Sequence, residues 1–351
     1  MLAPVVHILP ITRIRRHRLL PVAGRVLIRK GQNINPNDVV AEANLHPHHV
    51  LLDVAHSLGV PKGDADRYLE RDAGDTVSEG DVLAGPVGWN KRVLRAPCSG
   101  RIVLSGDGKM LLEEEKPPFQ ILAGLPGVVA FLIPGRGAVI ESVGSLVQGV
   151  WGNGAVGFGV LHVLIKKPDD ILTMDQIEVD LRGKVILTGY CGEEQVLRSL
   201  SELPIQGLVL SSMDSALIPL AKEQPFPIVV IDGFGVLPMN SLAYNLLRTS
   251  SEREITVNAE KRDVYTNQRP EVLISMPVDQ VVQEPRDTIV FSPGQRVRIV
   301  RAPHQAKIGT LIAIKTDLDV LPNGVKAKIA EVELENSKKI KLPLANLEVL
   351  E

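Results

Sequence analysis

The chain has 351 residues, of which 44% are hydrophobic and 23% charged, a balance that excludes extensive disorder and predicts two to four domains. The formal net charge of −2 gives the whole chain no attraction to nucleic acid or membrane. Two cysteines are too few for a disulfide framework, a four-cysteine zinc site or a cysteine-ligated iron–sulfur cluster. Aromatic residues make up only 3%, and 30 Gly and 25 Pro indicate many turns between short elements. We therefore expect a soluble, β-rich, cytoplasmic protein.

The N-terminus is basic: residues 1–30 hold seven Arg or Lys and no acid. Arg and Pro interrupt this region, so it does not match a secretory signal, and we interpret residues 1–19 as a basic surface arm that leads into a strand. The most apolar stretch, residues 121–165, is broken by Pro126 and Pro134 and is too interrupted for a membrane-spanning helix. We expect strands and turns there.

An internal repeat follows the arm. The segment GQNINPNDVVA, which begins at Gly31, recurs 43 residues later as GDTVSEGDVLA, which begins at Gly74. In each copy a Gly turn precedes an anchoring apolar residue, and an Asp precedes a second short strand. Since period-2 strands of this length need a partner to bury one face, we predict that the two copies lie side by side and close one small barrel.

The second copy continues as APCSGRIV, from Ala96 to Val103. This pattern resembles the barrel-sandwich hybrid family, which includes biotinyl and lipoyl carrier domains, and the resemblance covers about residues 20–113. Carrier domains present a modified Lys in a Met-Lys-Met hairpin, whereas this chain has Gly-Trp-Asn-Lys-Arg there, with Trp89 at the modified position. We therefore expect a barrel-sandwich-like domain over residues 20–116 without a prosthetic group, carrying a helical insert at residues 44–70.

The insert contains a candidate metal site. If Pro47 starts a helix, His49, Asp53 and His56 follow at i, i+4 and i+7 and share one face, and imidazole with carboxylate suits a divalent metal such as zinc or iron. The alternative is that these residues mark only a helix start and a packed surface. No other cofactor is predicted.

Residues 117–178 form a Gly-rich β segment, and residues 179–280 alternate strands and helices, which predicts a small parallel α/β domain. Ligands bind such sheets at the carboxyl ends of the strands. The residues that we expect at this edge are Gly189, Cys191, Gly192, Ser211, Asp214 and Asp232. Cys191 precedes a helix, where a thiol pKa can be lowered. The alternative is that tight strand-to-helix turns contain Gly without binding anything.

The segment FSPGQRVRIV, from Phe291, followed by Gly309-Thr-Leu-Ile, resembles the KOW motif that opens SH3-like barrels of ribosomal proteins and transcription elongation factors. The resemblance covers residues 289–351 and implies an SH3-like β-barrel. Its first strand and loop carry five basic side chains that could contact phosphates or a protein partner: Arg296, Arg298, Arg301, His304 and Lys307. The alternative is that Arg296 and Arg298 are the solvent face of an alternating strand.

Together these observations predict a multi-domain α+β/β fold: a barrel-sandwich hybrid, a Gly-rich β segment, a small parallel α/β domain and a C-terminal SH3-like barrel. No catalytic motif is recognisable. The sequence favours a non-enzymatic scaffold or adaptor that binds a protein or ribonucleoprotein partner through the KOW-like barrel. Two alternatives stay open, namely an accessory structural subunit of a larger enzyme and a small-molecule or nucleotide sensor that uses the α/β edge.

Overall fold

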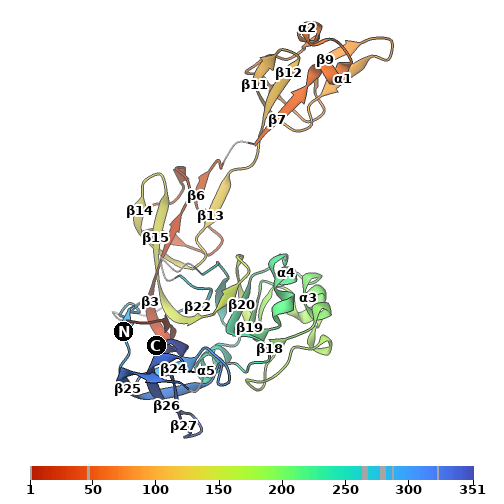
Figure 1. Ribbon diagram of the computed structural model, residues 1–351. Helices are drawn as coiled ribbons and strands as arrows, with labels where there is room; N and C mark the ends of the chain where they lie inside the picture. Colours follow the sequence, from red (N-terminus) through yellow and green to blue (C-terminus); the bar gives the residue numbers. More distant parts are fainter. Residues whose placement is uncertain (1, 46–47, 263–267, 277–281, 287, 322–323) are drawn as a thin grey trace.

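The computed structural model describes residues 2–45, 48–262, 268–276, 282–286, 288–321 and 324–351. Strands account for 48% of the chain and helices for 13%, which confirms the expected β-rich, multi-domain fold with several sheets. The molecule is elongated (Figure 1), and we name four parts of it. They are the C-terminal unit (residues 2–6 and 289–350), the central unit (145–275), the inner module (14–43 and 119–142) and the outer module (48–114).

The C-terminal unit is a six-stranded sheet to which both ends of the chain contribute. Its strands run in the order β2 (Val5–Val6), β28 (Leu347–Leu350), β24 (Arg296–Ile299), β25 (Ile308–Val320), β26 (Lys326–Leu334) and β27 (Lys339–Pro343), with η5 (Leu344–Asn346) before β28. A separate pair joins β1 (Leu2–Ala3) to β23 (Ile289–Val290). Val297, Leu311 and Val332 are fully buried between the strands, so this unit has a hydrophobic core of its own.

The basic residues 13–18 of the N-terminus lie in a strand that is paired within a sheet, so the expectation of a surface arm is wrong. β3 (Ile8–Leu19) lies antiparallel to β15 (Gly137–Gln148) along almost its whole length. Arg16 pairs with the buried Glu271 at 2.5 Å, and Arg18 pairs with Glu260 at 2.7 Å. Because these two arginines have acidic partners far along the chain, part of the basic charge of the N-terminus is neutralised within the fold.

The central unit confirms the predicted alternation of strands and helices. Its strands are β16 (Trp151–Gly152), β17 (Val156–Val163), β18 (Lys184–Cys191), β19 (Gly207–Met213), β20 (Ile228–Phe234), β21 (Glu254–Asn258) and β22 (Glu271–Ser275). β17 to β20 are parallel neighbours. The helices are α3 (Glu194–Ser201), α4 (Ile218–Lys222) and α5 (Ser241–Arg248), with short turns η2 (Met174–Gln176), η3 (Val179–Leu181) and η4 (Ser215–Leu217).

The two faces of the central sheet are covered differently. α3 and α4 pack on one face through Val196, Leu200 and Ala221. α5 packs on the other face through Ala243 and Leu247, in a core cluster that also includes residues of the C-terminal unit. The sheet continues through β22 to β15, so the Gly-rich segment 117–178 is divided between the central unit and the inner module.

The inner and outer modules have the same strand order. In the inner module the sheet is β3, β15, β14 (Gly127–Ile133) and β5 (Asn33–Ile34), beside the strands β4 (Arg25–Val26), β6 (Val39–Ala43) and β13 (Phe119–Leu122). In the outer module it is β7 (His48–Asp53), β12 (Lys109–Glu114), β11 (Gly100–Gly106) and β8 (Thr76–Val77), beside β9 (Val82–Val87) and β10 (Arg92–Arg95). The outer module also carries α1 (Val54–Leu58), α2 (Lys62–Ala65) and η1 (Asp66–Tyr68).

The registers of the two modules match position by position. A β-bulge interrupts the pairing of β11 with β12 between Ile102 and Leu104, and the same bulge interrupts β14 with β15 between Val129 and Phe131. The repeat turns are held alike, because Gly74 N donates to Ile102 O at 2.7 Å and Gly31 N donates to Val129 O at 2.8 Å. The modules are therefore two copies of one architecture.

This arrangement corrects the expected pairing of the repeat. The first copy packs in the inner core with Ile34 and Val40, and the second in the outer core with Val77 and Leu83. Each copy builds its own module, and the outer module is inserted between β6 and β13. In the outer module itself, the equivalent position between β9 and β10 is a short turn that contains Trp89. The insert predicted to be helical at residues 44–70 is helical only in part, because His48–Asp53 form the strand β7.

Candidate partner-binding sites

A buried cluster of charges joins the central unit to the C-terminal unit. Arg298 Nη1 lies 2.8 Å from Asp232 Oδ1, and its Nη2 lies 2.6 Å from Glu348 Oε1. Asn240 donates to Asp232 from its backbone N at 2.8 Å and from its side-chain Nδ2 at 3.0 Å. Arg269 adds a second cation 3.8 Å from Glu348. The side chains of Arg298 and Asp232 are 2% and 0% exposed, so neither is available to a partner in solution.

The protonation of this cluster follows from its burial and its partners. Burial raises the pKa of Asp232, while the Arg298 charge and the Asn240 donors act against that rise. Burial disfavours the guanidinium of Arg298, but Glu348 and Asp232 outweigh it and raise the pKa of this residue. Burial lowers the pKa of Arg269 to about 10, which still leaves it charged at neutral pH.

Two residues expected at separate sites thus bind each other. Arg298 was expected to contact phosphates, and Asp232 to line a ligand edge, yet the two form one buried ion pair. The alternation of β24 placed both arginines outward. That is wrong for Arg298, since the outer face of this strand packs on the central unit, where Nη1 also donates to Ile231 O at 3.2 Å.

The other basic residues of the expected phosphate-contacting surface lie at the start of β24 and in the loop that follows it. Arg296 is exposed but pairs with Glu335 at 3.1 Å. Arg301 and Lys307 are exposed, and His304 is half-buried. Exposed single ion pairs contribute about 0–1 kcal/mol, so Arg296 can exchange Glu335 for another anion at little cost. Of this set, Arg296 on β24 and Arg301 and Lys307 in the loop are therefore exposed, whereas Arg298 is removed from the surface.

The carboxyl edge of the central sheet is occupied by the chain itself. A Cβ at Gly189 would lie 1.7 Å from Asp170 O, so the glycine is required by the segment that crosses it. Ser211 Oγ donates to Leu237 O at 3.3 Å, and Asp214 Oδ1 accepts from Ala216 N at 2.9 Å. A Cβ at Gly192 would meet the side chain of Tyr190. The glycines and polar groups expected to bind a ligand thus have intramolecular roles.

Cys191 differs from the expectation of a low pKa. It is the last residue of β18, is fully buried and lies before α3 begins at Glu194. Burial raises its pKa to about 11, and the backbone hydrogen bond from Glu193 offsets only part of that effect. The thiol is therefore protonated at neutral pH.

The expected metal site does not share a helix face. His49 lies in β7, Asp53 ends that strand and caps α1 by accepting from His56 N at 2.8 Å, and only His56 is helical. The i, i+4, i+7 argument is therefore wrong, because strand residues at such spacing do not project from one helical face. Within the described ranges, no three His, Cys, Asp or Glu side chains form a group that could hold a metal ion.

A long hairpin of the C-terminal unit is a site that the sequence did not reveal. β25 and β26 are the longest strands of this unit, and near their turn Leu318 and Val320 are 63% and 59% exposed. Leu318 lies opposite Lys328, and Val320 opposite Lys326, so one face carries two apolar and two basic side chains. We call these four residues the hairpin patch. The alternation Leu-Asp-Val at residues 318–320 resembles a half-buried strand, and only the structure shows that nothing in the described chain covers it.

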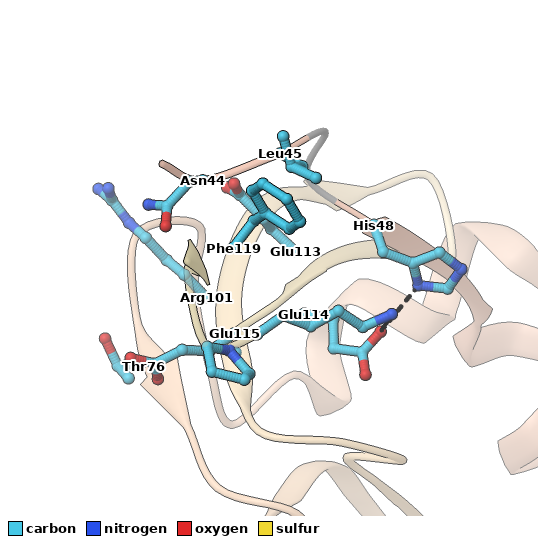
Figure 2. A pocket seen from close by; sticks show the side chains of 12 residues that line it. Asn44, Leu45, His48, Thr76, Arg101, Glu113, Glu114, Glu115 and Phe119 are labelled. Carbon is cyan, nitrogen blue, oxygen red and sulfur yellow. Dashed lines mark ion pairs between the residues drawn. The ribbon is translucent and has the colours of Figure 1, made fainter. Parts of the chain in front are cut away.

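A cavity lies where the outer module joins the connecting segments (Figure 2). The cavity, of about 700 Å³, is lined on one side by Asn44 and Phe119 and on the other by residues of the outer sheet such as Arg101. Glu114 Oε2 lies 2.9 Å from His48 Nδ1 and 3.0 Å from Lys116 Nζ. The hydrogen bond from Lys116 lowers the pKa of Glu114, and these pairs tie the connection to β7.

Comparison with known proteins adds no family assignment: no protein-family model and no curated protein matches the chain. Among the described residues, none of the helices is long and apolar enough to cross a membrane. Function must therefore be argued from the surfaces themselves.

Proposed function

We propose that this protein is a non-enzymatic adaptor that binds an acidic surface of a protein or ribonucleoprotein partner through its C-terminal unit, a KOW-type SH3-like barrel. The observation that carries the proposal is the hairpin patch. Leu318 and Val320 are each about 60% exposed, although the other strands of the six-stranded sheet bury most of their apolar side chains. Exposed apolar side chains that lie together and are flanked by charged residues are typical of interaction sites.

The chemistry of the patch favours an acidic partner. Lys326 and Lys328 stand directly across from the two apolar residues, so both groups would meet the same partner surface. Burying Leu318 and Val320 fully would contribute about 1.5–3 kcal/mol each, and the two lysines would supply orientation and speed of encounter. The exposed Arg301 and Lys307 add positive charge on a different loop of the same unit.

The rest of the molecule fits a scaffold. The buried ion cluster fixes the C-terminal unit to the central unit, so a partner bound at the hairpin patch would be held at a defined position relative to the central unit. We infer that the inner and outer modules are of the barrel-sandwich hybrid type. The exposed turn with Trp89 in place of a carrier lysine supports a structural role for the outer module.

Affinity capture with the full chain tests the proposal, with and without nuclease. We expect the double variant Leu318→Ser with Val320→Ser, and separately Lys326→Glu with Lys328→Glu, to lose the captured partner. The matched control is Leu2→Ser with Val290→Ser, since these two residues face each other across β1 and β23 and are 64% and 57% exposed.

Loss of the partner in both hairpin variants but not in the control would support the adaptor function. Loss on nuclease treatment would assign a ribonucleoprotein, and retention would assign a protein. Capture that persists in both hairpin variants would refute binding at this patch.

A further inference from the structure

The outer module exposes a row of leucines across three neighbouring strands. Leu51 of β7 lies opposite Leu111 of β12, and Leu111 lies opposite Leu104 of β11. Leu51 and Leu104 are 61% and 64% exposed, although the alternate residues of the same strands, such as Leu112 and Ile102, are completely buried. The sheet thus has one face in the module core and an apolar stripe on the other.

Charged residues flank this leucine row in two further rows of the same face. On one side lie His49, Glu113 and Arg101, which are cross-strand neighbours. On the other side Asp53 lies opposite Lys109. Each flanking row carries both an acid and a base, so the face as a whole is close to neutral.

In the inner module, the charged residues at the equivalent register positions pair with each other within the chain. Its register places Arg15 opposite Glu141, as the outer register places His49 opposite Glu113. Arg15 and Glu141 form a close ion pair. In the part of the chain that the structure describes, Glu113 and Lys109 have no ion pair within 4 Å. In the outer module the acid Glu113 and the base Lys109 are therefore free to pair with another molecule, and the strand register determines where they lie on the face.

We propose that this face binds the same face of a second copy of the chain, about a two-fold axis that runs along the leucine row. Such a rotation places each leucine against its counterpart and turns each flanking row onto the opposite row of the partner. Glu113 of one copy then meets Lys109 of the other, and His49 meets Asp53. Both contacts occur twice, because an isologous interface repeats every contact. The result is two sheets packed face to face, as in a β-sandwich.

Charge complementarity selects a second copy as the occupant. A generic apolar partner would leave Glu113 and Lys109 unpaired at the rim, whereas the two-fold pairs them with each other. Four strands at about 4.8 Å spacing and five residues at about 3.4 Å give a contact face of roughly 300 Å² in plan, below the standard size of stable interfaces. The dimer is accordingly weak, with a dissociation constant in the micromolar range, and its formation depends on protein concentration.

Sedimentation velocity of the full chain over a wide concentration series tests this pairing. We expect a reversible monomer–dimer equilibrium, and we expect Leu51→Ser with Leu104→Ser to raise the dissociation constant about a hundredfold or more. Trp89→Ser is the matched control, since this residue is exposed on a turn away from the face. It should leave the equilibrium unchanged.

Charge reversal at Glu113 and Lys109 provides a second test, in which a mixture of two variants restores association only if both variants are folded. Glu113→Lys alone places two like-charged pairs in the interface, and so does Lys109→Glu alone, and each should weaken the dimer about tenfold. An equimolar mixture of these two variants restores both opposite-charge pairs and should form heterodimers. A chain that stays monomeric throughout the series, a dimer insensitive to the leucine changes, or a mixture that does not associate would each overturn the proposal. Capture through the hairpin patch is unaffected by these changes, so the two proposals fail separately.

Discussion

The buried cluster at Arg298 makes a quantitative prediction. Replacing Arg298 with Met keeps much of the side-chain volume but leaves the carboxylates of Asp232 and Glu348 without their main cation. These carboxylates are 0% and 9% exposed, so water cannot replace the lost partner. Removing one member of a buried ion pair costs about 3–5 kcal/mol, because the remaining charge stays desolvated.

This loss is large enough to measure in the full chain. The central and C-terminal units together span about 200 residues, for which about 1 kcal/mol corresponds to a shift of roughly 2–4 °C in Tm. Arg298→Met should therefore lower the Tm of the transition that involves these units by about 6–20 °C. Differential scanning calorimetry, with hydrogen exchange at Val297 and Val349 as a local readout, measures the effect.

Arg296→Met is the matched control, because Arg296 lies two residues earlier on the same strand and pairs with Glu335 in solvent. Its cost should stay within about 1 kcal/mol. Adding Asp232→Asn to Arg298→Met removes the carboxylate that has no cation left, whereas Glu348 keeps Arg269 beside it, and this should recover part of the stability. If Arg298→Met were as mild as the control, the cluster would not hold the two units together and the reasoning would be refuted.

Three further predictions concern thiols, tryptophans and the inserted module. Iodoacetamide at pH 8 should label Cys98 and leave Cys191 unmodified, as read by peptide mass spectrometry. Burial raises the pKa of Cys191 to about 11 in the folded chain, whereas the unfolded thiol has its ordinary pKa of about 9. The contribution of Cys191 to stability is therefore constant below about pH 9 and declines between about pH 9 and pH 11, because the unfolded thiol loses its proton first. Urea titrations over this pH range measure the decline. Trp89, which is 101% exposed, should account for nearly all quenching by iodide, whereas Trp151, half-buried against Phe234, should be protected. Replacing residues 44–118 with a four-residue turn should leave a chain with unchanged far-UV circular dichroism per residue and an intact inner module; loss of cooperative unfolding would contradict this.

The elements of the central unit could be predicted from the sequence because local pattern and tertiary environment agree there. Strand β22 is a short run with a buried apolar centre, and α5 has its buried residues Ala243, Tyr244 and Leu247 at helical spacing, so the predicted alternation matches the structure. These segments have one apolar face or a fully apolar run, and their partners lie in the same sheet. The periodicity alone then determines which residues are buried.

The sites could not be predicted because their partners are remote in sequence. Arg298 occupies an outward position of an alternating strand, and only the packing of the central unit against that face, 66 residues away at Asp232, explains its burial. His49 lies two residues after Pro47 and precedes helical residues, so local signals favoured a helix, yet six consecutive pairings with β12 make the segment His48–Asp53 a strand. In both cases a non-local contact outweighed local propensity.

The repeat was visible in the sequence, but its nesting was not, and the structure gives the physical reason why such nesting is tolerated. The outer module begins and ends on paired strands, with His48 opposite Glu114, so its two ends lie side by side. The inner hairpin into which it is inserted also ends on a pair, Ala43 opposite Phe119. Joining two adjacent ends to two adjacent ends closes no long loop and disturbs no core, so the entropic cost is small. Insertion at a hairpin turn thus extends the molecule without altering either register, and it leaves the exposed leucine row far from the C-terminal unit that holds the hairpin patch (Figure 1).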